Sequence, residues 1–178
     1  MTANAVLTVS VRDARACEPD RLWIERVYRD YLDDLAPLDT GIFPALGEVG
    51  HREPDQLARW FGDPNAFPFL IVKSGDPVGF AMVDRAAAGA GARAPRYRMA
   101  EFFVSRASRG LGIGRIAAQL ILDRFAGWWE IVEYSRNPGA VTFWRRVLAA
   151  YTRGAVQERV VNGEVRQTFE SRPAARAL

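Results

Sequence analysis

The first third of the chain contains one strand-like and two helix-like hydrophobic patterns. Apolar and polar residues alternate well enough over residues 6–11 to predict a strand. Over residues 18–35 apolar side chains recur at helical spacing behind Pro19, which predicts an amphipathic helix. Residues 38–53 have no regular pattern and predict either a binding loop or a disordered connection. Residues 54–61 predict a second, short helix.

The remaining two-thirds predicts mostly strands, with two further helices. Two apolar runs around a turn at residues 74–77 predict an antiparallel hairpin over residues 69–83. Residues 86–95 are rich in Ala and Gly without periodicity, which indicates a flexible loop. The later predicted elements are a strand at 97–105, a helix from 113 to near Gly127, a strand at 129–134, a helix starting at Asn137-Pro138, and a closing hairpin over 156–169 that turns at Asn162-Gly163.

One stretch, residues 101–115, combines an apolar strand, a basic glycine-rich loop and the start of a helix. Glycine lets the backbone turn tightly and brings N–H groups close to a bulky anion. The first turn of the following helix adds unpaired N–H donors and the positive end of the helix dipole. We therefore predict a phosphate site, with pyrophosphate as the expected group. The residues behind this prediction are Arg106, Arg109, Gly110, Gly112, Gly114 and Arg115.

Two other phosphate-binding loops also lie between a strand and a helix. A P-loop ends in Gly-Lys-Ser/Thr, which is absent here. A dinucleotide fingerprint could be placed on residues 112–117, with Glu130 or Glu133 as the later acidic residue. That fingerprint needs its first glycine at the strand end, whereas six residues separate Val104 from Leu111. Too little chain follows for a doubly wound domain.

Composition narrows the class of protein. We expect residues 1–178 to form a single domain, since this length can bury a sizeable core. One cysteine excludes an internal disulfide and one histidine excludes a histidine-rich metal site, so no metal is expected. Without a leader pattern or a membrane-length apolar run we expect a cytoplasmic protein without a membrane partner. The net charge is only +3 and the arginines are scattered, so nucleic acid is not an expected partner.

Two motifs resemble those of one known family. Arg109-x-x-Gly112-x-Gly114 resembles the acyl-CoA pyrophosphate loop of the GNAT N-acetyltransferase superfamily. Asn137-x-x-Ala140-x-x-Phe143-Trp144 resembles that family's signature after the fifth strand, and the wording around both is similar to a little-described bacterial branch. The resemblance implies an α/β (α+β) fold: a mixed central sheet of about seven strands, splayed between strands 4 and 5 and flanked by about four helices.

The resemblance also implies a reaction: direct transfer of an acetyl group from acetyl-CoA to a primary amine of a small molecule or peptide. In this family the pantetheine arm lies between strands 4 and 5, and a strand-4 N–H stabilises the oxyanion that forms from the thioester. The residues that the resemblance assigns to acetyl-CoA are Phe103, Val104, Ser105, Arg109, Gly110, Leu111, Gly112, Ile113, Gly114, Arg115, Asn137, Phe143 and Trp144.

The catalytic residues are less clearly marked. Glu101 is the carboxylate of the fourth strand and suits the role of general base, although a surface pair with Arg98 is an equal alternative. Trp144 replaces the tyrosine that often protonates the leaving thiolate, so Tyr151 or Tyr134 becomes the candidate acid. The alternative is that no specific acid is required, because the coenzyme A thiolate is a stable leaving group. The missing tyrosine also suggests a non-catalytic acyl-CoA-binding module as an alternative, and an arginine-dependent RNA-binding protein is a weaker one.

Some properties are not encoded in any motif. The acceptor amine cannot be identified, nor can the use of acyl groups other than acetyl. The oligomeric state is open, with a homodimer as one option. Asp33 and Asp34 could attract a cationic amine or could simply be solvated at the end of their helix.

Overall fold

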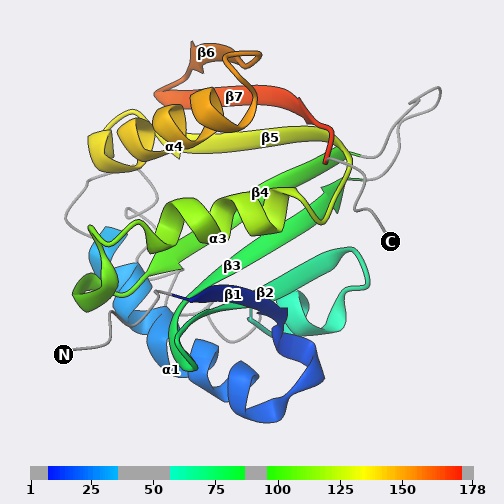
Figure 1. The fold of residues 1–178 in the computed structure, drawn as a ribbon, viewed down its shortest axis with the longest axis vertical. Helices are drawn as coiled ribbons and strands as arrows, with labels where there is room; N and C mark the ends of the chain where they lie inside the picture. The colour runs from blue at the N-terminus through cyan, green and yellow to red at the C-terminus, as the bar shows by residue number, and fades with distance from the viewer. Residues whose placement is uncertain (1–7, 36–56, 87–95, 174–178) are drawn as a thin grey trace, which may run out of the picture.

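A single mixed sheet organises the fold. The computed structural model describes residues 8–35, 57–86 and 96–173, and its seven strands lie in the order β1-β2-β3-β4-β5-β7-β6 (Figure 1). Neighbouring strands are antiparallel except β4 and β5, which are parallel. This confirms the predicted fold class. The elements are β1 Val9–Asp13, α1 Glu18–Leu35, β2 Ala66–Lys73, β3 Asp76–Ala86, β4 Arg96–Val104, α3 Ile113–Leu122, β5 Gly127–Tyr134, α4 Pro138–Tyr151, β6 Gln157–Val161 and β7 Glu164–Ser171.

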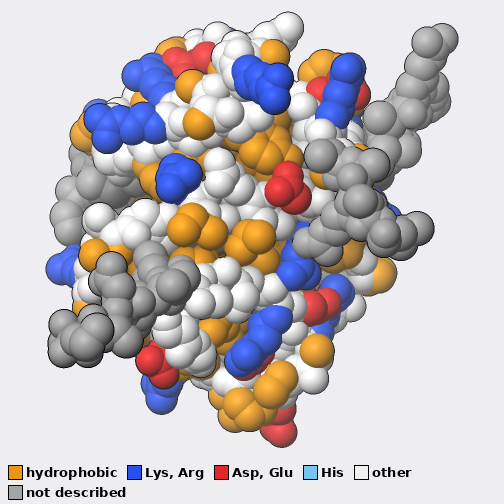
Figure 2. Space-filling model, in the orientation of Figure 1, with side chains coloured by type: hydrophobic (Ala, Val, Ile, Leu, Met, Phe, Trp, Pro, Cys, Tyr) orange, Lys and Arg blue, Asp and Glu red, His pale blue; other side chains and the backbone are white. Residues whose placement is uncertain are grey.

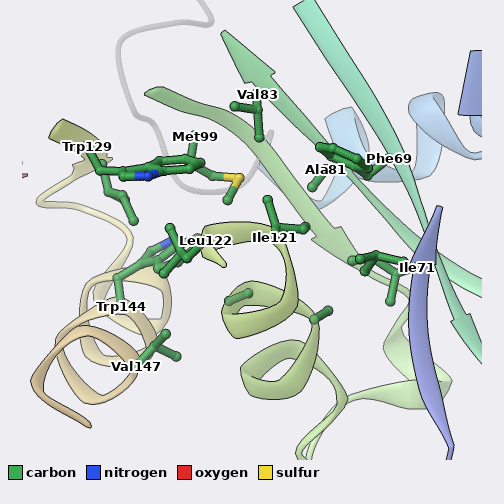
Figure 3. Close-up of a cluster of buried hydrophobic side chains, with 14 of the residues drawn as sticks. Phe69, Ile71, Ala81, Val83, Met99, Ile121, Leu122, Trp129, Trp144 and Val147 are labelled. Carbon is green, nitrogen blue, oxygen red and sulfur yellow. The ribbon is translucent and has the colours of Figure 1, made fainter. Parts of the chain in front are cut away.

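Hydrophobic side chains cover both faces of the sheet. Successive residues of a strand point to opposite faces, so the nearly continuous apolar run of β2 serves two cores. Phe69 and Ile71 pack on the side of α3 and α4, whereas Leu70 packs on the side of α1. Figure 3 shows the first core, which includes Trp129 of the sheet, Leu122 of α3 and Trp144 of α4. The helices α3 and α4, which carry parts of the two motifs, are thus held on one face of the sheet, and α1 is held on the other.

The strands β4 and β5 diverge along their length. They pair only from Arg96↔Trp128 to Met99↔Ile131. Beyond that point β4 stays paired with β3 as far as Val104↔Gly79, and β5 stays paired with β7 as far as Tyr134↔Glu164. The last residues of β4 therefore have an open backbone edge toward β5, which confirms the predicted splay.

A β-bulge lies where this divergence begins. Met82 of β3 pairs with Glu101 and Val83 pairs with Met99, so Ala100 is an extra residue in β4. A bulge re-aims the side chains that follow it. Met99 faces the α3 and α4 side, and in a regular strand Glu101 would face the same side. The bulge turns Glu101 toward α1 instead.

Several predicted boundaries shift. The first strand ends at Asp13 rather than at residue 11, while residues 6 and 7 lie outside the described residues; α3 ends at Leu122 rather than near Gly127. The α3 helix stops early because the chain must turn before β5, and the Phe125 ring packs against Tyr97 and Phe67 in that turn. The closing hairpin is confirmed, with Asn162 and Gly163 both in the left-handed region. Residues 57–62 are helical, while residues 38–53, 54–56 and 87–95 lie outside the described residues. None of the helices in the described ranges is long and apolar enough to cross a membrane.

Candidate functional site

The glycine loop needs its glycines for two different reasons. Gly110 and Gly112 have φ values of 78° and 77°, which side-chain-bearing residues rarely adopt, and a Cβ at either would point into open space. Gly114 is close-packed instead, because a Cβ there would lie 3.2 Å from the Phe143 ring, which would have to shift. Gly112 is the N-cap of α3 and offers no side-chain cap. The first N–H groups of α3 therefore keep their donors for a ligand.

A cleft of about 1080 Å³ runs past this loop. It lies between the end of β4, the glycine loop, the first turns of α4 and the last turn of α1. On the face seen in Figure 2, apolar side chains gather near the centre, with Lys and Arg side chains around them. Of the residues predicted to bind acetyl-CoA, those that line the cleft are Phe103, Val104, Arg109, Gly110, Gly112, Gly114, Arg115, Asn137, Phe143 and Trp144.

Three of the predicted residues do not line the cleft. The Ser105 N–H donates to the Val78 carbonyl of β3 at 2.8 Å. Ile113 is buried in the core of the α3 and α4 side. Leu111 projects from the loop with half of its surface exposed. The structure therefore brings together ten of the thirteen predicted residues at the cleft. Of the other three, Ser105 is bonded to β3, Ile113 lies in the core and Leu111 lies at the surface.

The open edge of β4 presents a backbone donor to the cleft. Because the Ser105 N–H points to β3 and strand directions alternate, the N–H and C=O of Val104 point to the open side. The Val104 carbonyl accepts a hydrogen bond from Arg109 Nε at 2.8 Å. The Val104 N–H is thus directed toward the space between the splayed strands.

An acidic residue from α1 holds two arginines of the loop. Asp34 accepts a hydrogen bond from Arg106 Nε at 2.6 Å and a second one from Arg109 Nη2. Burial alone would raise the pKa of Asp34, but these two guanidinium groups hold it below its ordinary value. Asp34 also lines the cleft. The Asp34 carboxylate is therefore paired with arginines and is not free to attract an amine. It accepts hydrogen bonds from guanidinium groups that could otherwise donate to a phosphate.

The start of α4 forms the opposite wall. Asn137 caps the helix, its Oδ1 accepting from the Ala140 N–H at 3.1 Å, and Pro138 is the first helical residue. The cap aims the helix so that the Phe143 ring stacks on Phe102 with centroids 5.6 Å apart. The Trp144 ring packs edge-on against Phe102 at 5.2 Å and is buried. An apolar wall thus faces the open edge of β4.

Glu101 pairs with a tyrosine rather than with Arg98. The Tyr31 hydroxyl, from α1, donates to Glu101 Oε2. Burial raises the pKa of Glu101 to about 7, although the Tyr31 hydrogen bond and the charge of Arg98 both act to lower it. Arg98 therefore influences Glu101 through its charge. A half-buried carboxylate with a pKa near neutrality is well suited to exchange protons.

Tyr31 is a site residue that the sequence did not single out. It lines the cleft, and its hydroxyl is bonded to Glu101, which is not among the lining residues. In the sequence Tyr31 belongs to the apolar stripe of a helix, and its partner lies 70 residues further along the chain. The one available signal is that a tyrosine in such a stripe needs a partner for its hydroxyl.

The other tyrosines lie elsewhere. The Tyr151 hydroxyl donates to Asp123 at 2.8 Å and shares a 2.8 Å hydrogen bond with Ser171, on the side of α4 that faces β7. Burial raises the pKa of Tyr151 to about 12. Neither Tyr151 nor Tyr134 is among the residues that line the cleft. The structure does not bring Tyr151 to the site, because the last turn of α4 has passed the cleft.

The site and the fold together define a class of protein: one in which a cleft runs from a glycine-rich loop at a helix start to the opening between two splayed parallel strands. A family model described as the acetyltransferase (GNAT) family matches residues 17–149. The chain therefore belongs to the GNAT family of acetyltransferases. The sequence matches no curated protein in direct comparison.

Solved structures share the fold at low sequence identity. A GNAT-family protein from Desulfovibrio desulfuricans is 14% identical with a TM-score of 0.63, covering 93% of this chain and 100% of its own. PaiA N-acetyltransferase from Thermoplasma acidophilum, solved with coenzyme A, is 9% identical with a TM-score of 0.62, covering 92% and 99%. Spermidine N-acetyltransferase from Vibrio cholerae, solved with CoA and spermine, is 12% identical with a TM-score of 0.55, covering 92% and 95%.

Proposed function

We propose that this GNAT protein transfers an acetyl group from acetyl-CoA to a primary amine of a small molecule or peptide. One observation carries the proposal: a continuous cleft connects the phosphate-binding features of the glycine loop with the open edge of β4, and Tyr31 in its wall is bonded to Glu101. The spermidine N-acetyltransferase with its bound spermine supports an amine acceptor. We also propose that residues 1–178 act as one domain.

The glycine loop would hold the phosphates of acetyl-CoA. Gly110 and Gly112 leave open space beside the loop, and the uncapped N-terminus of α3 supplies N–H donors and the positive end of a helix dipole. Arg115 is exposed at the first turn of that helix and adds positive charge. These features fit a pyrophosphate better than a neutral ligand.

The open edge of β4 would hold the reacting thioester. The Val104 N–H, directed into the gap, suits the oxygen on which negative charge develops as the amine attacks. Phe102 and Phe143 form an apolar wall beside it, which excludes water and strengthens that electrostatic contact. Asn137 keeps the first turn of α4 in place as its cap.

Glu101 would take the proton that the amine must lose. The amine arrives as an ammonium ion and becomes nucleophilic only after deprotonation. With a pKa of about 7, Glu101 is largely ionised at pH 8 and accepts a proton without binding it too tightly to release. Its hydrogen bond to Tyr31 connects this carboxylate to the wall of the cleft.

The experiment is a screen of primary amines with purified protein and acetyl-CoA. Free thiol release and the mass of the acetylated amine are both recorded, so that transfer is separated from hydrolysis. The proposal predicts stoichiometric amide and coenzyme A for at least one class of amine. Trp144, in the position of the family's tyrosine, favours a second candidate: a non-catalytic acyl-CoA-binding module. That candidate predicts binding of acetyl-CoA without amide formation.

A further inference from the structure

The leaving thiolate needs a proton, and the second motif does not supply a donor. Trp144 cannot act as an acid, and Tyr151 is bonded to Asp123 and Ser171 away from the cleft. Tyr31 is the one tyrosine among the described residues that line the cleft. It comes from α1, which neither motif includes.

The Tyr31 ring is fixed by its neighbours. It packs edge-on against Phe80 and Phe103, with centroids 5.5 and 5.8 Å away, and lies 5.7 Å from the ring of Tyr28. These contacts leave the hydroxyl directed at Glu101. Burial, followed by the charge of Glu101, raises the pKa of Tyr31 well above its ordinary value of 10.0. The phenol therefore carries its proton at neutral pH and is a donor.

We propose that Tyr31 is the general acid of the reaction and that Glu101 supplies it with the proton. The proposal rests on the proposed acetyl transfer. Glu101 takes one proton from the ammonium ion, so that the amine can attack the thioester carbon. As the C–N bond forms, the nitrogen loses its second proton to solvent. As the C–S bond breaks, the sulfur takes the phenol proton of Tyr31, and the phenol oxygen takes the proton from the Glu101 carboxylic acid. The net products are amide, coenzyme A thiol and one proton.

This arrangement links acid and base through one hydrogen bond. While Glu101 is a carboxylate, it holds the Tyr31 proton. Once Glu101 has been protonated, it no longer has to accept the hydrogen bond from Tyr31. The Tyr31 hydroxyl can then donate its proton toward the cleft. The donor thus becomes available after the base has acted, and both groups return to their starting states at the end of one turnover.

The test compares Tyr31→Phe with Tyr28→Phe in the full chain. Phenylalanine keeps the ring packing of both residues, and Tyr28 contacts the same aromatic cluster without lining the cleft. We expect Tyr31→Phe to lower kcat by about a hundredfold with unchanged affinity for acetyl-CoA, and Tyr28→Phe to change kcat by less than about twofold. Adding Tyr31→Phe to Glu101→Gln should cost little more, because the two residues act as a unit. Equal kcat for Tyr31→Phe and wild type, or full additivity, would overturn the proposal.

A second readout does not depend on turnover. The carboxyl carbon of Glu101 is titrated by NMR, with its signal assigned from Glu101→Gln. Loss of the Tyr31 hydrogen bond should raise the pKa of Glu101 above its wild-type value, and Tyr28→Phe should leave it in place. An unchanged titration in Tyr31→Phe would overturn the link between the two residues.

A failure of amine transfer can be told apart from a failure of this proposal. If the wild type binds acetyl-CoA but acetylates no amine, the proposed acceptor class is wrong. Hydrolysis of bound acetyl-CoA then replaces transfer as the assay, because the thiolate needs the same proton. Slower hydrolysis in Tyr31→Phe but not in the Tyr28→Phe control would retain Tyr31 as the acid, while equal hydrolysis in all variants, or none in the wild type, would reject it.

Discussion

Two glutamates flank the point where the sheet opens, Glu101 half-buried and Glu133 buried, and they differ in what surrounds them. Burial raises the pKa of Glu101 on β4 to about 7 and that of Glu133 on β5 to about 8. Glu101 is bonded to Tyr31, which lines the cleft. Glu133 faces the α4 side of the sheet, and neither of its oxygens has a hydrogen-bond partner among the described residues. A raised pKa therefore does not by itself mark a catalytic group, and access to the cleft separates the two.

The largest expected effect comes from removing the base. Glu101→Gln should lower kcat by about 10²-fold or more, because the amide cannot accept a proton, while Glu133→Gln should leave kcat within about twofold. Steady-state kinetics on both variants, with acetyl-CoA affinity measured separately, checks this contrast. A similar loss in both variants would mean that the change in the buried charge, not the position of Glu101, matters.

The raised pKa of Glu133 should make the stability of the folded protein depend on pH. The folded-state pKa of Glu133 lies above its ordinary value of 4.5, so the folded protein keeps a proton that the unfolded chain releases between pH 4.5 and about 8. This carboxyl therefore lowers stability as pH rises through that window. Glu133→Gln should stabilise the protein at pH 8 by about 2 kcal/mol and have little effect at pH 4.5. Urea denaturation at both pH values measures it, and an equal effect at both would contradict burial as the cause.

The pH dependence of kcat reports on Glu101 directly. Its carboxyl must be ionised to act as a base, so activity rises with pH through a pKa of about 7. At pH 6 kcat should be about tenfold below its value at pH 8. Glu101→Gln should remove this limb of the profile, and Glu133→Gln should preserve it. A limb near pH 4.5 in the wild type would show that Glu101 is solvated.

A third carboxylate, Asp34, has the opposite electrostatic setting and the smallest expected effect. It holds Arg106 and Arg109 and repels incoming phosphates. Asp34→Asn should therefore tighten coenzyme A binding by about three- to tenfold, whereas Asp33→Asn, an equal change of charge at an exposed neighbour, should change it by less than about twofold. Weaker binding by Asp34→Asn would mean that Asp34 positions the arginines for the ligand.

The sequence predicted the parts of the site that depend on local chemistry. The turns at Gly110 and Gly112, the helix cap at Asn137 and the order of the strands along the chain follow from short stretches of sequence. The splay and the seven-stranded sheet came from the family resemblance. Predicting these features did not require knowing how distant parts of the chain pack together.

The parts that escaped prediction depend on long-range packing. Tyr31 meets Glu101, and Asp34 meets Arg109, across 70 and 75 residues of sequence. The bulge at Ala100 that turns Glu101 toward α1 has no clear mark in the strand sequence. Tyr151 has the side chain that an acid needs, but the length of α4 carries it past the cleft.

The most direct test of the account is calorimetric titration of the wild-type protein and Gly112→Glu with acetyl-CoA. A glutamate at position 112 would strain a left-handed backbone with a φ of 77° and add negative charge at the start of α3. We predict one-to-one binding by the wild type and a loss of about a hundredfold or more in affinity for the folded variant. Absence of binding by the wild type, or equal binding by the variant, would contradict the assignment of this loop and cleft to acetyl-CoA.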